Sequence, residues 1–215
     1  MKYWETRLSL LGQYAFLPMT VEGALQSDIA ALETNFCEML PHDKNGRRVI
    51  YYDRSRISNA VYKRDSIVRV MWYVIHKVSN EENAQNAGFV LLTDCRQDTL
   101  HSFDRKLVKL LIDSCIRVAP IRLRALHICC STHRSILNFV CPAMKMIVGK
   151  RIRGRTILHS GDPKELLYDL EDYGMSANIL PISLGGSYHS DVFQVQENHH
   201  LETSATLLNQ FARTA

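Results

Sequence analysis

The side chains best suited to covalent chemistry stand in one short run, Cys129-Cys130-Ser131-Thr132-His133-Arg134. A cysteine nucleophile that ends a strand, followed by an arginine at a helix start, could bind and attack a phosphate ester. The spacing is short for that chemistry, because only four residues separate Cys129 from Arg134. The loop also lacks a glycine that would let its amides converge on a phosphate. A Cys-dependent phosphatase is therefore a remote alternative, and we expect buried thiols and no catalytic residue.

Arginines form two groups that could bind phosphate. Arg122 and Arg124 precede one apolar run, and Arg151, Arg153 and Arg155 precede another. In extended chain, residues two apart face the same way, so each group is predicted to point as a row. Guanidinium groups bind phosphate oxygens by forked hydrogen bonds. The rows predict a head-group site at the amino edge of the strands, whereas exposed arginines that only solubilise this edge are the alternative.

The segment 135–148 is predicted to be a helix with an unusually wide apolar surface. One stripe comprises Ile136, Phe139, Val140, Ala143 and Ile147, and a second comprises Leu137, Met144 and Val148. A crossover helix on a sheet needs only one apolar face. Either the N-terminal segment covers the second face, or the helix is a lid between a lipophilic guest and a bilayer or neighbour. Met144 suits such an adaptable surface, and Pro142 should kink the helix.

These candidate sites would be positioned by alternating strands and helices. Apolar runs predict strands at 49–52, 89–93, 126–130 and 156–159. Helical patterns lie at 21–40, 65–78, about 98–118, 131–148 and 163–172, and a polar loop is expected at 79–87. The alternation from residue 48 onward predicts an α/β fold with a mainly parallel sheet and right-handed crossovers.

Composition limits the classes of function. The 215 residues are 46% apolar and 22% charged, as in an ordinary globular protein, with a formal net charge of +4. This mild excess suits an anionic membrane surface and does not demand nucleic acid. No apolar run is long enough to span a membrane. Neither a secretory signal nor a Cys-x-x-Cys pair is present, so we expect a cytoplasmic protein with free thiols and no metal.

Other residues with chemical potential have simpler interpretations. His127 and His159 lie within apolar strands and are expected to be satisfied core histidines. Asp94 ends the second predicted strand, yet no histidine or metal cluster stands near it in the sequence. No glycine-rich phosphate loop follows a strand, so no nucleotide cofactor is expected.

Five motifs together resemble the CRAL-TRIO lipid-binding family. They are Gly46-Arg47-Arg48-Val49-Ile50-Tyr51-Tyr52-Asp53, Phe89-Val90-Leu91-Leu92-Thr93-Asp94, Pro120-Ile121-Arg122-Leu123-Arg124-Ala125-Leu126-His127, Gly154-Arg155-Thr156-Ile157-Leu158-His159 and Leu180-Pro181-Ile182-Ser183-Leu184-Gly185-Gly186. Their order and spacing agree over roughly residues 46–186. The resemblance implies a bowl of strands and helices that holds one lipid, retinoid, tocopherol or phospholipid behind a gate helix at about 135–148.

The resemblance also implies a division of the chain and a set of partners. It suggests a shortened helical extension at 1–45, a lipid-binding domain at 46–190 and a polar tail at 191–215. We expect a monomer that associates reversibly with membranes. The pocket and gate residues would be Ile136, Phe139, Val140, Ala143, Met144 and Ile147.

The motifs look most like the tocopherol-transfer and retinaldehyde-binding subgroup. By motif position, that subgroup's phosphoinositide-binding cations map to Arg122, Arg124, Arg151 and Arg155. Ile121 stands where phosphatidylinositol-transfer relatives carry an acidic residue. A protein-interaction module that keeps the fold but carries no cargo is the principal alternative function.

Overall fold

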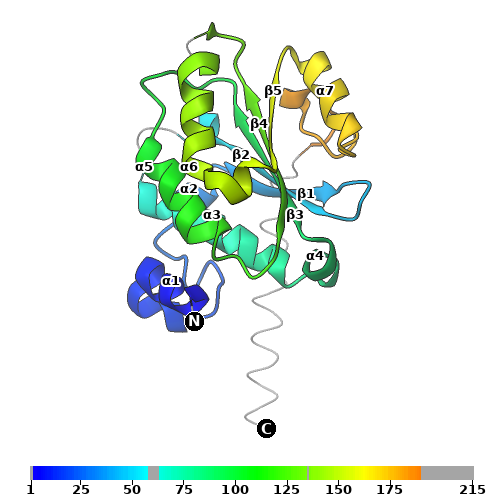
Figure 1. Ribbon diagram of the computed structural model, residues 1–215. Coiled ribbons are helices and arrows are strands. Elements are labelled where there is room, and N and C mark those ends of the chain that lie inside the picture. Colours follow the sequence, from blue (N-terminus) through cyan, green and yellow to red (C-terminus); the bar gives the residue numbers. More distant parts are fainter. Residues whose placement is uncertain (1, 58–62, 135, 190–215) are drawn as a thin grey trace.

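The computed structural model describes residues 2–57, 63–134 and 136–189 (Figure 1). At its centre lies one sheet with the strand order β1-β2-β3-β4-β5. The strands are β1 (Cys37–His42), β2 (Arg48–Asp53), β3 (Phe89–Cys95), β4 (Leu123–Cys130) and β5 (Thr156–Ser160). Strand β1 is antiparallel to β2, and β2 to β5 are parallel. The predicted α/β fold class and all four predicted strands are confirmed.

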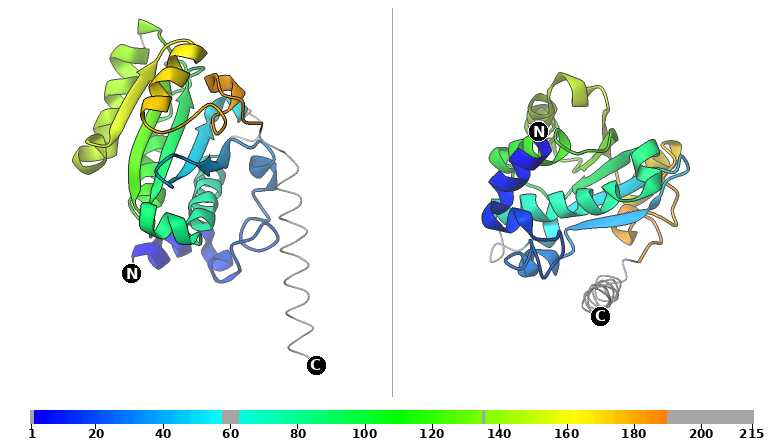
Figure 2. Two further views of the ribbon diagram at one scale, coloured as in Figure 1. Left: turned by 90° about the vertical axis from the view of Figure 1, so that its right-hand side faces the viewer. Right: turned by 90° about the horizontal axis from the view of Figure 1, so that it is seen from below.

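Helices cover the two faces of the sheet unequally (Figures 1 and 2). One face carries α3 (Arg64–Ser79), α5 (Arg105–Leu110) and α6 (Cys141–Arg153), with the π-helical segments η3 (Leu111–Ile116) and η4 (Ile136–Val140). The other face is covered by α7 (Pro163–Asp172) and by the chain that follows it to η5 (Ile182–Leu184) and Tyr188. Both faces of β2 to β4 are therefore buried, which explains their continuous apolar runs.

The N-terminal segment packs against α3. It comprises α1 (Lys2–Leu11), η1 (Gly12–Phe16) and the short α2 (Ile29–Leu32). The Tyr3 ring stacks on Trp72 at a centroid distance of 5.0 Å, and its hydroxyl lies 2.9 Å from Nδ1 of His76. Arg69 of α3 forms two 2.7 Å hydrogen bonds with the buried carboxylate of Asp28. These contacts fix the segment beside α3.

The predicted helix at 21–40 is wrong over most of its length. Only Ile29–Leu32 is helical there, and Cys37–His42 forms the edge strand β1. Pro41 explains the outcome, because proline breaks a helix interior but is accepted in an edge strand. The register of β1 on β2 shifts between Leu40 and His42, so Pro41 lies in a bulge.

Two other boundaries differ from the prediction. The helix expected from Asp98 begins only at Arg105, since the Asp104 carboxylate caps it by accepting from the backbone N–H groups of Lys106 and Leu107. The expected polar loop at 79–87 contains α4 (Glu82–Ala87). A short 3₁₀ turn, η2 (Arg54–Arg56), follows β2. Among the described residues, every helix is too short or too polar to cross a membrane.

Candidate functional site

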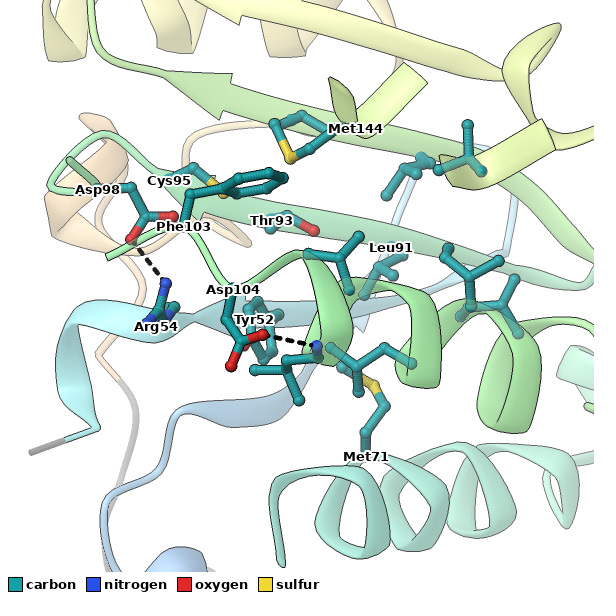
Figure 3. A pocket seen from close by; sticks show the side chains of 18 residues that line it. Tyr52, Arg54, Met71, Leu91, Thr93, Cys95, Asp98, Phe103, Asp104 and Met144 are labelled. Carbon is teal, nitrogen blue, oxygen red and sulfur yellow. Dashed lines mark hydrogen bonds and ion pairs between the residues drawn. The ribbon is translucent and has the colours of Figure 1, made fainter. Parts of the chain in front are cut away.

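An apolar cavity lies between the sheet and the helices of the first face (Figure 3). Its wall includes Leu91 of β3, Met71 of α3, Leu107 of α5, and Met144 and Val148 of α6. The cavity volume is about 80 Å³, which is below the roughly 150 Å³ of an apolar cavity that holds benzene. Ligand pockets of about 300–1,000 Å³ are usual. The cavity in this structure is therefore smaller than a usual ligand pocket.

The helix over this cavity turns inward only part of the predicted set of pocket and gate residues. Ile136, Val140, Met144 and Val148 are all buried, and the last two line the cavity. Among the other predicted gate residues, Phe139 is 66% exposed on the outer side. Ala143 and Ile147 are only half-buried, and they are not part of the cavity wall.

The backbone of the helix that begins at Ile136 explains why its inward residues differ from those predicted. Ile136–Val140 is π-helical, so each turn takes up more residues than an α-helical turn. Ile136 and Val140, four residues apart in this segment, both face inward, and Met144 and Val148 continue the buried series in α6. The helix also extends to Arg153, beyond the predicted end at residue 148, with non-helical angles at Gly149 (φ 72°, ψ 169°). Pro142 causes no break, because it stands in the first turn of α6, where its missing N–H is tolerated.

The arginines do not form two extended rows. Arg151 and Arg153 belong to the end of α6, so that part of the prediction is wrong. Arg124 donates to the carbonyls of Asn86 and Ala87 at the end of α4. Arg155 donates to the Leu123 carbonyl, between Arg122 and Arg124 in sequence.

Comparison with known families and structures shows the family of this chain. The sequence model of the family described as "Divergent CRAL/TRIO domain" matches residues 46–193, well over half of the chain. The chain belongs to this family. The crystal structure of Sfh5 matches with a TM-score of 0.52 and 15% sequence identity. That match covers 64% of this chain and 53% of the Sfh5 chain. No curated protein sequence matches.

Membership of this family supports a lipid-binding or lipid-transfer domain. In this CRAL/TRIO domain, the apolar cavity lies on the same face of the sheet as the helix predicted to be its gate. The resemblance to the tocopherol-transfer and retinaldehyde-binding subgroup remains a prediction. The predicted roles of Arg122, Arg124, Arg151 and Arg155 also remain predictions.

The cysteine run of this CRAL/TRIO domain has no features of a nucleophile. Cys129 is fully buried, and burial, together with the nearby Asp94, raises the pKa of its thiol to about 12. A thiolate is the reactive form, so this environment opposes attack on a phosphate ester. Arg134 is exposed. All six cysteines are buried and free, as predicted.

The two strand histidines form a stacked pair on the opposite face of the sheet. Nδ1 of His127 lies 2.9 Å from Nε2 of His159, and both rings meet the Tyr173 ring edge-on. Burial, with smaller contributions from His159 and Arg47, lowers the pKa of His127 to about 3. A carboxylate oxygen of Asp169 lies 3.6 Å from Nδ1 of His159. These rings are core residues, and they lie away from the cavity.

Sequence reasoning missed the polar end of the cavity. Arg54, Asp98 and Asp104 line that end together with Phe103 (Figure 3). The Arg54 guanidinium lies 3.7 Å from the Asp98 carboxylate, and it donates to the Ser102 carbonyl. Burial raises the pKa of Asp98, and Arg54 opposes this shift. The available signal was the position of Arg54 and Asp98 just beyond the ends of β2 and β3, the edge where α/β folds bind ligands.

Proposed function

We propose that this CRAL/TRIO domain carries one lipophilic molecule beneath the helix Ile136–Arg153 and exchanges it at membranes, without catalysis. The observation that carries the proposal is the apolar cavity roofed by Met144 and Val148. A chain of methylenes gains about 0.8 kcal/mol per CH₂ on leaving water. A bilayer solvates the same chain, so exchange between bilayer and protein is nearly balanced, and it can run in either direction.

Loading requires the helix to move outward, because the closed cavity is too small for a lipid. Gly149 is the natural place for this movement, since it already interrupts the helix with a positive φ of 72°. The cost of separating Met144 and Val148 from the sheet would be offset by the guest that replaces their contacts. The same movement would widen the cavity toward α6.

The outer side of this helix suits contact with a membrane. Phe139 and Leu137 are exposed there, and basic residues follow at the end of α6. Arg122, Arg124, Arg151 and Arg155 would bind phosphoinositide head groups of the membrane surface. The hydrogen bonds that Arg124 and Arg155 make are to neutral carbonyls, so their charges are not neutralised there. Each cation near an anionic surface contributes about 1 kcal/mol of attraction. The domain would then act as a cytoplasmic monomer that associates reversibly with membranes.

The test is native mass spectrometry of protein purified from cells, with lipid transfer between vesicles as a second readout. We expect a co-purified lipid in the wild type and in Met146→Trp, whose side chain is 69% exposed. Met144→Trp fills the cavity and should lose the lipid while still folding, as circular dichroism would report. A wild-type protein that is empty and also inert toward vesicles would refute the carrier function.

The small cavity favours one other candidate, an interaction module that keeps the fold and carries no cargo. Its volume of about 80 Å³ is what a packed core with a minor void would leave. This candidate predicts an empty protein in the same measurement. It also predicts that Met144→Trp changes stability and nothing else.

A further inference from the structure

Two buried thiols join the sheet to the helix over the cavity. Sγ of Cys130, the last residue of β4, lies 3.0 Å from Sγ of Cys141, the first residue of α6. Both side chains belong to the core of the first face of the sheet. Two free thiols in contact can together supply two electrons by forming a disulfide. The carrier function alone gives this pair no task.

The thiol pair lies directly behind the wall of the cavity. Ile128, two residues before Cys130 on the same face of β4, lines the cavity. Cys95 of β3 is the register partner of Cys130, and it lines the cavity as well (Figure 3). Met144 lines it from α6, three residues after Cys141 and therefore on the same side of the helix. A guest that fills the cavity would thus lie next to the thiol pair.

The two cysteines of this pair are suited to different roles. The hydrogen bond from Cys130 lowers the pKa of Cys141, and the charge of Lys145 lowers it as well, although burial opposes both. The same hydrogen bond raises the pKa of Cys130. A thiolate is the nucleophilic form of cysteine, and a neighbouring thiol can complete a disulfide once the first sulfur is oxidised. Cys141 would therefore react first and Cys130 second.

Loading of the cavity would also control access to Cys141. Its side chain is 1% exposed, so a reagent dissolved in water cannot reach the sulfur while the helix lies on the sheet. The outward movement proposed for loading turns about Gly149, which stands near the other end of α6. The start of the helix, with Cys141, would therefore move away from the sheet as the guest enters. A reactive group on the guest would reach the sulfur before a solute does.

We propose that the domain reduces a hydroperoxide group on its lipophilic cargo, with Cys141 as the attacking thiol and Cys130 as the second thiol. This inference rests on the proposed carrier function. The Cys141 sulfur bonds to the terminal oxygen of the hydroperoxide, the O–O bond breaks, and the departing alkoxide takes the thiol proton to become an alcohol. The Cys130 sulfur then displaces hydroxide from the Cys141 sulfenic acid, and the hydroxide leaves as water with the Cys130 proton. Two thiols and one lipid hydroperoxide thus give one disulfide, one lipid alcohol and one water, and each protein molecule reacts once before an external dithiol must reduce it.

The experiment treats reduced, lipid-stripped protein with linoleic acid, with its monohydroperoxide, or with hydrogen peroxide as an oxidant dissolved in water. Native mass spectrometry reports binding, chromatography of the extracted lipid reports the hydroxy product, and intact mass reports the loss of two hydrogens. The test variants are Cys141→Ala and Cys130→Ala. Cys115→Ala is the control, because Cys115 is a buried free thiol that bonds to the Val68 carbonyl and does not line the cavity. Met144→Trp keeps both thiols and fills the cavity, and circular dichroism checks that each variant is folded.

We expect the wild type and Cys115→Ala to form one hydroxy fatty acid and one disulfide per protein molecule. The lipid hydroperoxide should react about tenfold faster or more than hydrogen peroxide at equal concentration, because bound cargo is held beside the thiol. Cys141→Ala should bind the lipid hydroperoxide and leave it intact. Cys130→Ala should yield the alcohol but stop at a sulfenic acid, which dimedone traps. Met144→Trp should lose the preference for the lipid hydroperoxide.

The remaining outcomes separate this inference from the carrier function. A wild type that binds the lipid hydroperoxide and leaves it intact would overturn the inference, and the carrier function would stand. The same conclusion follows if Cys141→Ala reduces the hydroperoxide as well as the wild type does, or if hydrogen peroxide reacts equally fast. A wild type that binds neither form of the fatty acid would also overturn the inference, and the lipid that co-purifies with the protein would still decide the carrier function.

Discussion

The sulfur atoms of Cys130 and Cys141 lie 3.0 Å apart and join the last residue of β4 to the first residue of α6. Both side chains are buried, with 1% exposure each. The hydrogen bond between them raises the pKa of Cys130 and lowers that of Cys141. This thiol pair holds the start of the helix over the cavity to the sheet, and a disulfide between the two cysteines would make that link covalent.

Oxidation by hydrogen peroxide is expected to convert this thiol pair into a disulfide, with two molecules of water as the other product. The crosslink closes a short loop, so the free energy of unfolding should rise by about 3 kcal/mol, and exchange of lipid should slow. Intact-mass and thermal-unfolding measurements would report these changes. Because the pair is buried, the reaction rate should follow opening of the helix.

Cys141→Ala is the control for this oxidation. The variant should neither lose two hydrogens nor gain stability under the same treatment. Addition of oxygen to the wild type, without loss of the two thiol hydrogens, would show that the sulfurs cannot reach bonding geometry.

Two methionines of α6 test which side of the helix faces the cavity. Met144 is 5% exposed and lines the cavity, whereas Met146 is 69% exposed. Met144→Ala should lower the free energy of unfolding by about 2 kcal/mol, because it removes packed atoms next to an existing void. Met146→Ala should change it by less than about 0.5 kcal/mol. Urea unfolding of the two variants side by side is the measurement, and equal losses would contradict the observed phase.

The contrast between strands and the gate helix shows what sequence patterns predict. Strands β2 to β5 followed from continuous apolar runs, because a buried parallel strand must be apolar on both faces. The phase of Ile136–Val148 did not follow, because a π-helical segment shifts it and leaves no period that a 3.6-residue pattern can detect. The existence of the helix and three of its inward residues, Ile136, Val140 and Met144, were therefore predictable, but the outward position of Phe139 was not.

The polar end of the cavity was hidden for a different reason. Arg54 and Asp98 stand in two separate segments, and each is unremarkable in its own sequence context. Only the parallel pairing of β2 with β3 brings the segments after these strands to one edge of the sheet. The arginines at the amino edge were conspicuous in the sequence because they lie two residues apart. Arg151 and Arg153 are helical, however, so the second group does not form the extended row that this spacing predicted.

Substitution of Gly186 tests the tight turn after η5, with Gly154 elsewhere in the chain as the control. A Cβ on Gly186 would clash with the Leu180 carbonyl and approach the Ala177 carbonyl oxygen to 2.7 Å. These are backbone atoms of the turn, which also accepts hydrogen bonds there, so they cannot move cheaply. Gly186→Ala should lower the free energy of unfolding by about 3 kcal/mol.

Gly154→Ala is the matched substitution, since nothing lies within 4 Å of its added Cβ and its φ is −66°. It should leave stability unchanged or raise it by about 0.5 kcal/mol. Thermal unfolding of both variants checks the pair. A tolerated Gly186→Ala would mean that the turn is looser than the structure indicates.

The buried His127 makes stability depend on pH. Its pKa is lowered from 6.5 to about 3 in the folded protein, first by burial and then by His159 and Arg47. The unfolded chain therefore binds more protons than the folded protein between these values. Stability should fall as the pH drops from about 6.5 toward 3, by up to ~4 kcal/mol from this group alone.

His127→Phe should reduce this loss of stability at acid pH, because the replacement ring fills the space beside Tyr173 and has no group that binds a proton. It also removes Nε2, a buried atom with no hydrogen-bond partner, and gives up the contact with His159. Near neutral pH the two effects oppose each other, so the variant should lie within about 1 kcal/mol of the wild type. Urea unfolding at about pH 4 and about pH 7 gives the slope for each protein. Parallel pH dependence in both would assign the acid sensitivity to other groups, of which His159, whose pKa burial also lowers, is the next to test.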